Sequence, residues 1–561
     1  MLGQEFFYLG DWRIKCYNIS MKKWRQKTFI WLKENWSWFS FILIFLLAFG
    51  VFAYLQHSSY FADPDSFYHA KMALLLRDEG VFKELPWLQY TVISENFTNQ
   101  HFLYHFCLIP FVTFFHPLIG LKLATVLLGA FLIALFYGVL KRLEIKGAFF
   151  YALLLLTVNP FVFRISLAKA PSVSLVFLLL GVYFIFNHKI KSLFVLSFLY
   201  VWFYGGFILI LIAAGTFILV DFIYHRLLKK PSALRLLEKL YSLVGRHRRF
   251  LERKNAHLKI FLASLLGVIL GLVINPYFPH NFNFYYHQLI KIGIINYSKI
   301  IGVGGEWYRY GFLDLISNTI ALSIVLVVAL VLFVIFFKKQ SKLSLTSFFI
   351  YLLFFIFTLK SRRYVEYYVP FGLFFGAVAI SDALRGINLK KYFLEFKRLY
   401  FRGLGAKTLI TIVIVYILVV FPTVVIRDFK TAKRDLSSGI AFDKYYYVSK
   451  WLENNSEPGE IVIHSDWDDF PVLFYHNHHN YYIVGLDPTF MYEYDKDLYW
   501  QWVNLTMGKE VENLYTMVKE EFKAAYILIE KDHLGMYQNV SRTSGFSLVY
   551  EDELVYLYQV N

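Results

Sequence analysis

Apolar runs about twenty residues long recur through the first three quarters of this chain and constrain its fold more than any other feature. About 20 consecutive apolar residues are needed for a helix to cross the roughly 30 Å hydrocarbon core of a bilayer. The composition agrees, since 58% of the 561 residues are hydrophobic and 20% are aromatic, which is far above soluble domains. We therefore predict a mainly α-helical, polytopic transmembrane bundle of about eleven spans. The runs lie near 37–56, 118–140, 147–163, 172–187, 192–204, 206–224, 258–275, 312–336, 343–359, 366–384 and 408–426.

Two segments can each be counted in two ways, so the number of spans could differ from eleven by two. The run 192–204 is short, and Tyr204-Gly205-Gly206 after it fits either a tight hairpin or a broken helix. The segment 102–115 is apolar but too short to cross a bilayer, so we expect it to lie in the membrane interface.

The basic residues between the runs predict which face of the membrane each loop occupies. Residues 1–36 hold seven Lys and Arg, the loop 226–259 holds eleven and the loop 385–407 holds seven. Such residues concentrate in cytoplasmic loops, and eleven spans with the N-terminus inside place all three there. This topology also accounts for the net charge of +17, so no nucleic-acid partner is inferred. The extracytoplasmic face, in a prokaryotic plasma membrane, then carries 57–117, 164–171, 276–311, 360–365 and 427–561.

Residues 427–561 differ in character from the rest and predict a separate α/β domain. They hold 22 acidic against 12 basic residues and no further run of membrane length. Short β-rich runs alternate with helical stretches, as in an α/β layer. The expected strands lie at 461–463, 481–484, 525–529 and 554–558, and the expected helices at 444–454 and 508–522. The chain thus divides into a cytoplasmic segment 1–36, a transmembrane domain 37–426 and an extracytoplasmic domain 427–561.

A pair of acids, Asp63-Pro-Asp65, directly follows the first apolar run. Carboxylates at positions i and i+2 can present oxygens to Mg²⁺ or Mn²⁺. For the bare motif, a solvated turn is an equal alternative. Its location favours function, because acids at a membrane boundary beside Tyr68 and His69 are costly to keep.

Four segments together resemble the catalytic subunits of oligosaccharyltransferases, which belong to the GT-C superfamily of membrane glycosyltransferases. Asp65-Ser-Phe-Tyr68-His69 is similar to the acidic and aromatic signature after the first transmembrane helix of that family. Val201-Trp202-Phe203-Tyr204-Gly205-Gly206-Phe207 is similar to its tryptophan-glycine-glycine segment. Gly304-Gly305-Glu306-Trp307 lies in the external loop that carries its substrate-contacting glutamate. Arg362-Arg363-Tyr364 resembles its phosphate-contacting segment. The likeness runs loosely from about residue 37 to 384 and implies a GT-C-like bundle.

The chain departs from this family at two places. The second acidic pair should lie between the third and fourth spans, where this chain has Arg164 and Lys169 but no acid. Either Mg²⁺ or Mn²⁺ is held weakly by Asp63, Asp65 and Glu306, or no metal is required and the two basic residues neutralise phosphate directly. The segment Trp467-Asp468-Asp469 only faintly resembles the family's acceptor motif, so recognition of a glycosylation sequon is not inferred.

The resemblance implies a role for each remaining motif residue. Asp65 is expected to activate or orient the acceptor, assisted by Glu306 and beside Asp63. Arg362 and Arg363 are expected to bind the donor phosphate, although arginines at a helix boundary also serve as membrane anchors. Glu306 has the alternative of a solvated acid. Arg164 and Lys169 are expected to complete the set of residues that bind the donor phosphate. The expected acceptor or substrate region comprises Tyr68, His69, Trp307, Trp467, Asp468 and Asp469.

These features predict an integral membrane glycosyltransferase that acts at the extracytoplasmic face. It would move a sugar or oligosaccharide from a polyprenyl-(pyro)phosphate donor to a protein, glycan or lipid acceptor, with membrane lipids around the bundle. Within this class, a single-sugar transferase using a polyprenyl monophosphate is the alternative, and the missing acidic pair favours it. A transporter or lipid flippase is the alternative of another class. Most spans lack a deep charged residue and no internal repeat is evident, both of which count against it.

Overall fold

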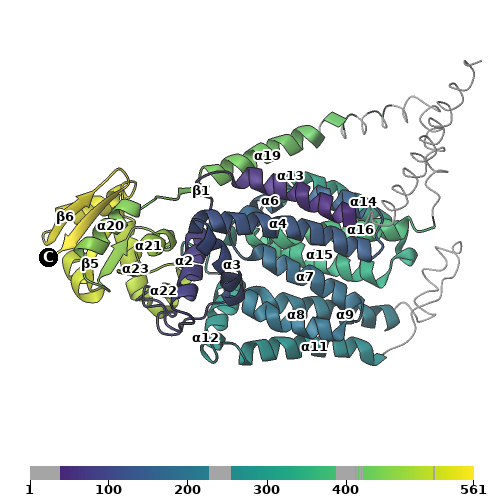
Figure 1. Ribbon diagram of the computed structural model, residues 1–561, viewed down its shortest axis with the longest axis horizontal. Coiled ribbons are helices and arrows are strands. Elements are labelled where there is room, and N and C mark those ends of the chain that lie inside the picture. The colour runs from purple at the N-terminus through teal and green to yellow at the C-terminus, as the bar shows by residue number, and fades with distance from the viewer. Residues whose placement is uncertain are drawn as a thin grey trace, which may run out of the picture.

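The computed structural model describes residues 38–226, 254–386, 421–509 and 512–561, together with isolated positions between 408 and 419. The predicted segment 1–36, most of the two large basic loops and part of the run 408–426 lie outside the described residues. A long helical bundle forms one end of the molecule and a sheet-bearing region forms the other (Figure 1). The expectation of a mainly helical chain with a C-terminal sheet region is confirmed.

Within the described part, five helices are long and apolar enough to cross a membrane, and the number rises to seven if two bent pairs each count as one span. This supports a multi-pass membrane protein, while the number eleven stays a prediction. The five are Trp38–Gln56, α4 (Pro117–Arg142), Gly205–Ile223 with most of α9 (Ile208–Arg226), α15 (Lys342–Lys360) and Arg362–Ala383 with α16 (Val365–Ala383). The bent pairs are α5 (Ala148–Leu155) with α6 (Asn159–Ser166), and α13 (Phe312–Asn318) with α14 (Ile320–Ile335). Shorter apolar helices are α3 (Phe102–Phe114), α7 (Pro171–Phe186), α8 (Ile190–Phe203) and α11 (Lys254–Val273).

Helix α16 is the most deeply buried helix of those that could span. Of its apolar window, 89% is buried, against 28% for the helix Trp38–Gln56. Helices α14 and α15 pack against it. Gly376 permits this approach, because a Cβ there would lie 2.7 Å from Val325 Cγ1, and small residues let transmembrane helices come close. Since α16 begins two residues after Arg363, its burial fixes the position of that arginine.

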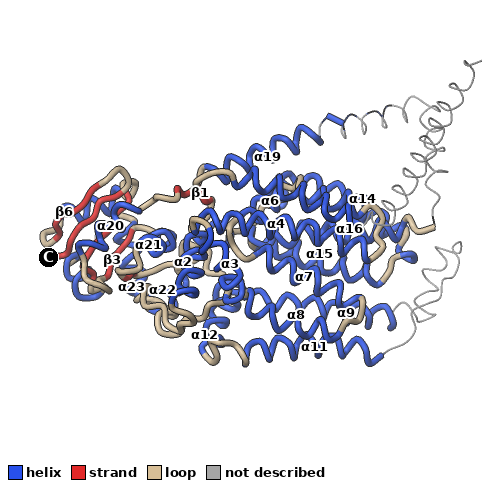
Figure 2. Tube along the Cα trace, in the orientation of Figure 1, coloured by secondary structure: helices blue, strands red, loops and turns tan. Residues whose placement is uncertain are grey.

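The C-terminal region is built on a five-stranded mixed sheet in the order β4-β3-β5-β7-β6, which Figure 2 shows at the end of the molecule away from the bundle. Strand β3 is parallel to β4 and β5, and β7 is antiparallel to β5 and β6. The strands are β3 (Ile461–His464), β4 (Tyr481–Tyr482), β5 (Ala524–Glu530), β6 (Phe546–Glu551) and β7 (Val555–Val560). The helices are α20 (Tyr446–Asn455), α21 (Phe470–His476), α22 (Thr489–Tyr494), α23 (Lys496–Thr506), α24 (Leu514–Thr516) and α25 (Leu534–Arg542).

Four expected strands are confirmed in place, although β4 is shorter than its run. Strand β6 and helices α21, α22, α23 and α25 were not expected. The stretch 508–522, expected to be one helix, contains α24 followed by a π-helical turn at Met517–Glu521.

The loop after the first membrane helix is tied to the sheet-bearing region. Strand β1 (Tyr60–Phe61) pairs antiparallel with β2 (Ile440–Ala441), and α2 (Asp65–Asp78) packs on α21. Gly439 is required next to this pairing, because a Cβ there would lie 2.1 Å from the Phe61 carbonyl oxygen. These contacts bring the acids of the first loop and the loop before α21 to the same place. Helices α12 (His280–Tyr285) and α19 (Phe421–Ser437) complete the described α-helices.

Candidate active site

A cavity of about 550 Å³ lies where the helical bundle meets the sheet-bearing region. Its walls come from the start of α2, the α6–α7 junction, the loop 303–307, the turn before α16, and the loops before α21 and α22. Most of the residues singled out in the sequence line it. These are Asp63, Asp65, Tyr68, His69, Arg164, Lys169, Glu306, Trp307, Arg363, Trp467 and Asp468.

Lys169 bridges the two acids of the first loop. Its Nζ lies 2.7 Å from Asp63 Oδ2 and 2.8 Å from Asp65 Oδ2. Burial lowers the pKa of Lys169, but the two carboxylates outweigh it and hold the pKa above its ordinary value, so the side chain is an ammonium ion. Burial raises the pKa of Asp63 to about 6, and the shared ammonium offsets this only in part. At pH 7 Asp63 is therefore still ionised.

Glu306 joins the arginines on the other wall of the cavity. It forms ion pairs with Arg164 through Oε2 and with Arg363 through Oε1, the latter at 3.1 Å. Burial raises the pKa of Glu306, but Arg164, Arg363 and Lys169 outweigh it and hold the pKa well below its usual range. The carboxylate is therefore ionised throughout the neutral range, and the alternative of a solvated acid is excluded by its salt bridges.

Arg164 also contacts a buried acid that the sequence did not single out. Its Nη2 lies 2.8 Å from Oε2 of Glu366, whose side chain is fully buried at the start of α16. Because both carboxylates occupy its guanidinium, Arg164 is not a free phosphate ligand. It acts on the cavity by holding Glu306.

The two adjacent arginines before α16 point to different places. The guanidinium of Arg363 stacks over the Trp307 ring at 4.9 Å and donates to Tyr204 OH at 3.0 Å. Arg362 does not line the cavity; it donates to the carbonyl of Arg309 at 3.2 Å. We therefore correct the expectation that both arginines can reach a donor phosphate, and only Arg363 stays in the candidate site.

The three acids expected to bind a metal do not fit a divalent cation in this arrangement. Mg²⁺ and Mn²⁺ prefer about six oxygen ligands at close range. Five of the six carboxylate oxygens of Asp63, Asp65 and Glu306 already accept from Lys169, Arg164, Arg363 or the Asp65 amide. Only Asp65 Oδ1 has no hydrogen-bond or ion-pair partner within the described residues.

A histidine cluster lies behind the first-loop acids. His69 lines the cavity, and its Nδ1 is 2.7 Å from Nε2 of His105. Burial lowers the pKa of His69 well below its ordinary value, and His105 and His101 lower it further. The imidazole is therefore neutral at pH 7.

The sheet-bearing region contributes an acidic wall. Asp466, Asp468 and Asp487 line the cavity. Burial raises the pKa of Asp468 to about 7 and that of Asp487 to about 6. Asp469 instead turns away from the cavity: its Oδ1 accepts from Tyr445 OH at 2.6 Å and its Oδ2 accepts from the Asp466 amide at 3.0 Å. Its expected role in acceptor contact is corrected to a structural one.

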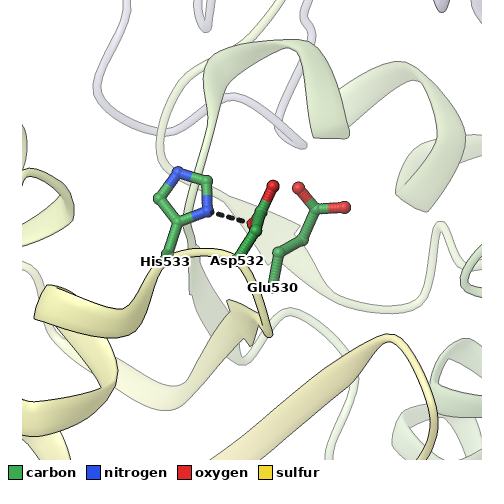
Figure 3. Close-up of side chains that lie close together, drawn as sticks. All are labelled: Glu530, Asp532 and His533. Carbon is green, nitrogen blue, oxygen red and sulfur yellow. Dashed lines mark hydrogen bonds and ion pairs between the residues drawn. The ribbon is translucent and has the colours of Figure 1, made fainter.

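One other group of potential metal ligands lies outside the cavity, at the end of β5 (Figure 3). Ligand atoms of Glu530, Asp532 and His533 lie within 4.8 Å of one another. Glu530 already pairs with Lys444 at 2.6 Å, and 79% of the Asp532 side chain is exposed. The group is therefore explained without a metal ion, as a surface cluster in which Lys444 pairs with Glu530.

Sequence reasoning missed several residues of the site. Tyr204 lies inside the segment 201–207, and Glu366 lies two residues after the segment Arg362-Arg363-Tyr364. A polar side chain at the end of an apolar run was a signal that could have identified both. Asp487 belongs to no motif and reaches the cavity only through the loop before α22.

Comparison with known proteins identifies the fold. No protein-family model and no curated protein sequence matches this chain. Its structure is similar to the archaeal oligosaccharyltransferase AglB from Archaeoglobus fulgidus, with a TM-score of 0.62 and 12% identity over 95% of this chain and 75% of AglB. The chain has the GT-C fold. The arabinofuranosyltransferase AftD from Mycobacteria, which shares this fold, is similar with a TM-score of 0.50 and 12% identity over 94% of this chain. The match covers 40% of AftD, so this chain corresponds to less than half of it. The GT-C resemblance indicated by the sequence motifs is confirmed at the level of the fold.

Proposed function

We propose that this chain is a membrane glycosyltransferase that transfers a sugar from a polyprenyl-phosphate-linked donor to an acceptor in the cavity. The observation that supports it most is the position of Asp65. Its Oδ1 is the one oxygen of the three candidate carboxylates without a partner in the described residues, and it shares the cavity with Lys169 and Arg363. A proton acceptor and cations for a phosphate leaving group are what a glycosyl transfer requires.

The proposed reaction is a single displacement at the anomeric carbon. The acceptor nucleophile forms a bond to that carbon, and the bond from carbon to the phosphate oxygen breaks. The electron pair stays on the phosphate oxygen, where Lys169 and Arg363 stabilise the charge. Asp65 accepts the proton of the nucleophile, and Glu306 keeps Arg363 in place. One displacement inverts the anomeric configuration.

The charge balance of the cavity favours a single phosphate in the donor. Three cations, Lys169, Arg164 and Arg363, face four carboxylates, Asp63, Asp65, Glu306 and Glu366. These groups sum to one net negative charge, so the second phosphate of a pyrophosphate would add negative charge that no cation of this set offsets. We therefore place the single-sugar transferase with a polyprenyl monophosphate donor ahead of an oligosaccharide transferase with a pyrophosphate donor.

The structural likeness to AglB supports a lipid-linked donor. AglB was solved in complex with an inhibitory peptide and a dolichol-phosphate. We propose by analogy that a polyprenyl phosphate lies against the bundle of this chain and that the acceptor enters from the side of the sheet-bearing region. Protein, glycan and lipid acceptors all remain within the proposal.

The test is sugar transfer by the purified, reconstituted protein. Polyprenyl monophosphate and pyrophosphate donors carrying a labelled sugar are offered with a peptide, a glycan and a lipid acceptor, and Asp65→Asn serves as the matched inactive variant. We expect transfer from a monophosphate donor and none from the variant. Absence of transfer with every pair, combined with movement of a labelled lipid across the vesicle membrane, would favour the transporter alternative.

A further inference from the structure

The cavity carries its own cation between the two first-loop acids. Lys169 reaches them from the α6–α7 loop, about a hundred residues later in the chain, and its Nζ is within 2.8 Å of both carboxylates. The Lys169 side chain is only 13% exposed, so the surrounding structure holds it in this place. A bridging metal ion would occupy the same position between the same oxygens.

The bridging geometry is specified from both sides. The Asp65 amide donates to Asp63 Oδ1 at 3.0 Å, which fixes the two carboxylates relative to each other. On the lysine side, the amide of Lys169 donates to the Leu167 carbonyl at 2.8 Å, which closes a tight turn between α6 and α7. The ammonium uses two of its three hydrogens on the acids. The third is left for a phosphate oxygen in the cavity.

We propose that Lys169 is an internal replacement for a divalent cation, so that the site functions without bound metal. The statement that catalysis needs no metal rests on the proposed function. The statement that Lys169 excludes a metal ion concerns only the folded site. Like charges a few ångströms apart repel each other strongly at the effective dielectric of a protein. A divalent ion could therefore bind the acids only after Lys169 had left them.

The direct test is a Mn²⁺ titration of the purified full-length protein, washed with EDTA and followed by electron paramagnetic resonance. The parent is expected to leave Mn²⁺ free up to about 1 mM, the range in which weak carboxylate sites fill. Lys169→Met keeps most of the stem and removes the charge, and should bind Mn²⁺ at least on the order of tenfold more tightly than the parent. Lys169→Arg should exclude Mn²⁺ like the parent.

Two controls make the gain of binding specific. Lys299→Met is the same substitution at an exposed lysine, and should bind no more Mn²⁺ than the parent. Lys169→Met combined with Asp63→Asn removes one of the freed carboxylates, and should lose the Mn²⁺ gained by the single variant. Mn²⁺ should also raise the Tm of Lys169→Met and leave the Tm of the parent unchanged.

The proposal is overturned if the parent binds one Mn²⁺ that Asp65→Asn abolishes, or if a folded Lys169→Met gains no binding. Should that variant not fold, the parent titration alone still decides. A separate arm measures sugar transfer in EDTA, which should stay within about twofold of the rate without a chelator. If no donor is used at all, the proposed function fails while the Mn²⁺ titration still tests Lys169.

Discussion

The two walls of the cavity carry charge in opposite ways. On the bundle side, Asp63, Asp65 and Glu306 are each paired with a cation. On the sheet side, Asp468 and Asp487 form no salt bridge within the described residues, and burial raises the pKa of both. The bundle wall is therefore preorganised around ion pairs, whereas these acids of the sheet wall have no such partner, and the charge of Asp468 changes with pH near neutrality.

This difference indicates a division of labour between the two walls. A phosphate needs fixed positive charge that costs no reorganisation during the reaction, and Lys169 and Arg363 are held by carboxylates. The acceptor needs polar contacts that can adapt to its shape, and the acids before α21 and α22 lie on loops. We therefore expect substitutions on the bundle wall to affect the transfer step and those on the sheet wall to affect acceptor use.

The largest effect is expected at Asp65. Asp65→Asn removes the proposed proton acceptor and should lower the rate of transfer about 10²- to 10⁴-fold, the usual contribution of a general base. Asp63→Asn should have a smaller effect, because both oxygens of Asp63 already have partners in the fold. The measurement is the rate of sugar transfer at saturating donor and acceptor.

The matched comparison across the cavity is Asp468→Asn. It should raise the KM for the acceptor more than it lowers the rate at saturation. Equal losses of turnover in Asp65→Asn and Asp468→Asn would remove the distinction between the two walls.

The next effect separates two neighbouring arginines. Arg363→Ala removes a charge-assisted bond worth about 1.5–3 kcal/mol, so use of the donor should weaken roughly tenfold to a hundredfold. Arg363→Lys should recover only part of this, because an ammonium cannot reproduce the planar fork or the stacking on Trp307. The assay is kcat/KM for the donor.

Arg362→Ala is the control for that prediction, since Arg362 does not line the cavity. It should leave kcat/KM for the donor within about twofold of the parent, as expected of a surface substitution. A larger loss in Arg362→Ala than in Arg363→Ala would contradict the assignment.

The sequence predicted which residues lie around one cavity better than it predicted their contacts. Motifs placed on one face of the membrane by charge and hydropathy do line one cavity. Arg362 and Arg363 could not be separated, because adjacent residues in a short turn differ only in where their side chains point. The bridging by Lys169 depends on a contact between distant segments, and no local pattern encodes such a contact.

The fold shows the same limit. The strands expected from β-branched and aromatic runs are present, because their buried faces are continuous. Strand β6 was missed since it lies at the edge of the sheet and is only half-buried, so its pattern lacks a clear apolar face. The shorter apolar helices α7 and α8 have the composition of spans but not their length. Whether these two helices cross the membrane depends on how they pack in the bundle, and composition carries no information about that packing.

The smallest effect tests the unpaired acid of the sheet wall through its pH dependence. Burial raises the pKa of Asp468 to about 7 from an ordinary value of 3.8. Between about pH 4 and 7 the folded state then holds a proton that the unfolded state has lost, so stability falls as pH rises through this window. Asp468→Asn removes the buried charge. It should raise the Tm above that of the parent at pH 8 by roughly 2–4 °C, the shift that about 1 kcal/mol produces in a domain of 150–250 residues. At pH 4 the two proteins should unfold at the same temperature.

Glu553→Gln is the control, because it neutralises an exposed acid in the turn between β6 and β7. It should shift the Tm at neither pH. A gain in Tm that is equal at pH 4 and pH 8 would mean that the substitution acts through packing, and Asp468 would then not give the sheet wall a pH-dependent charge.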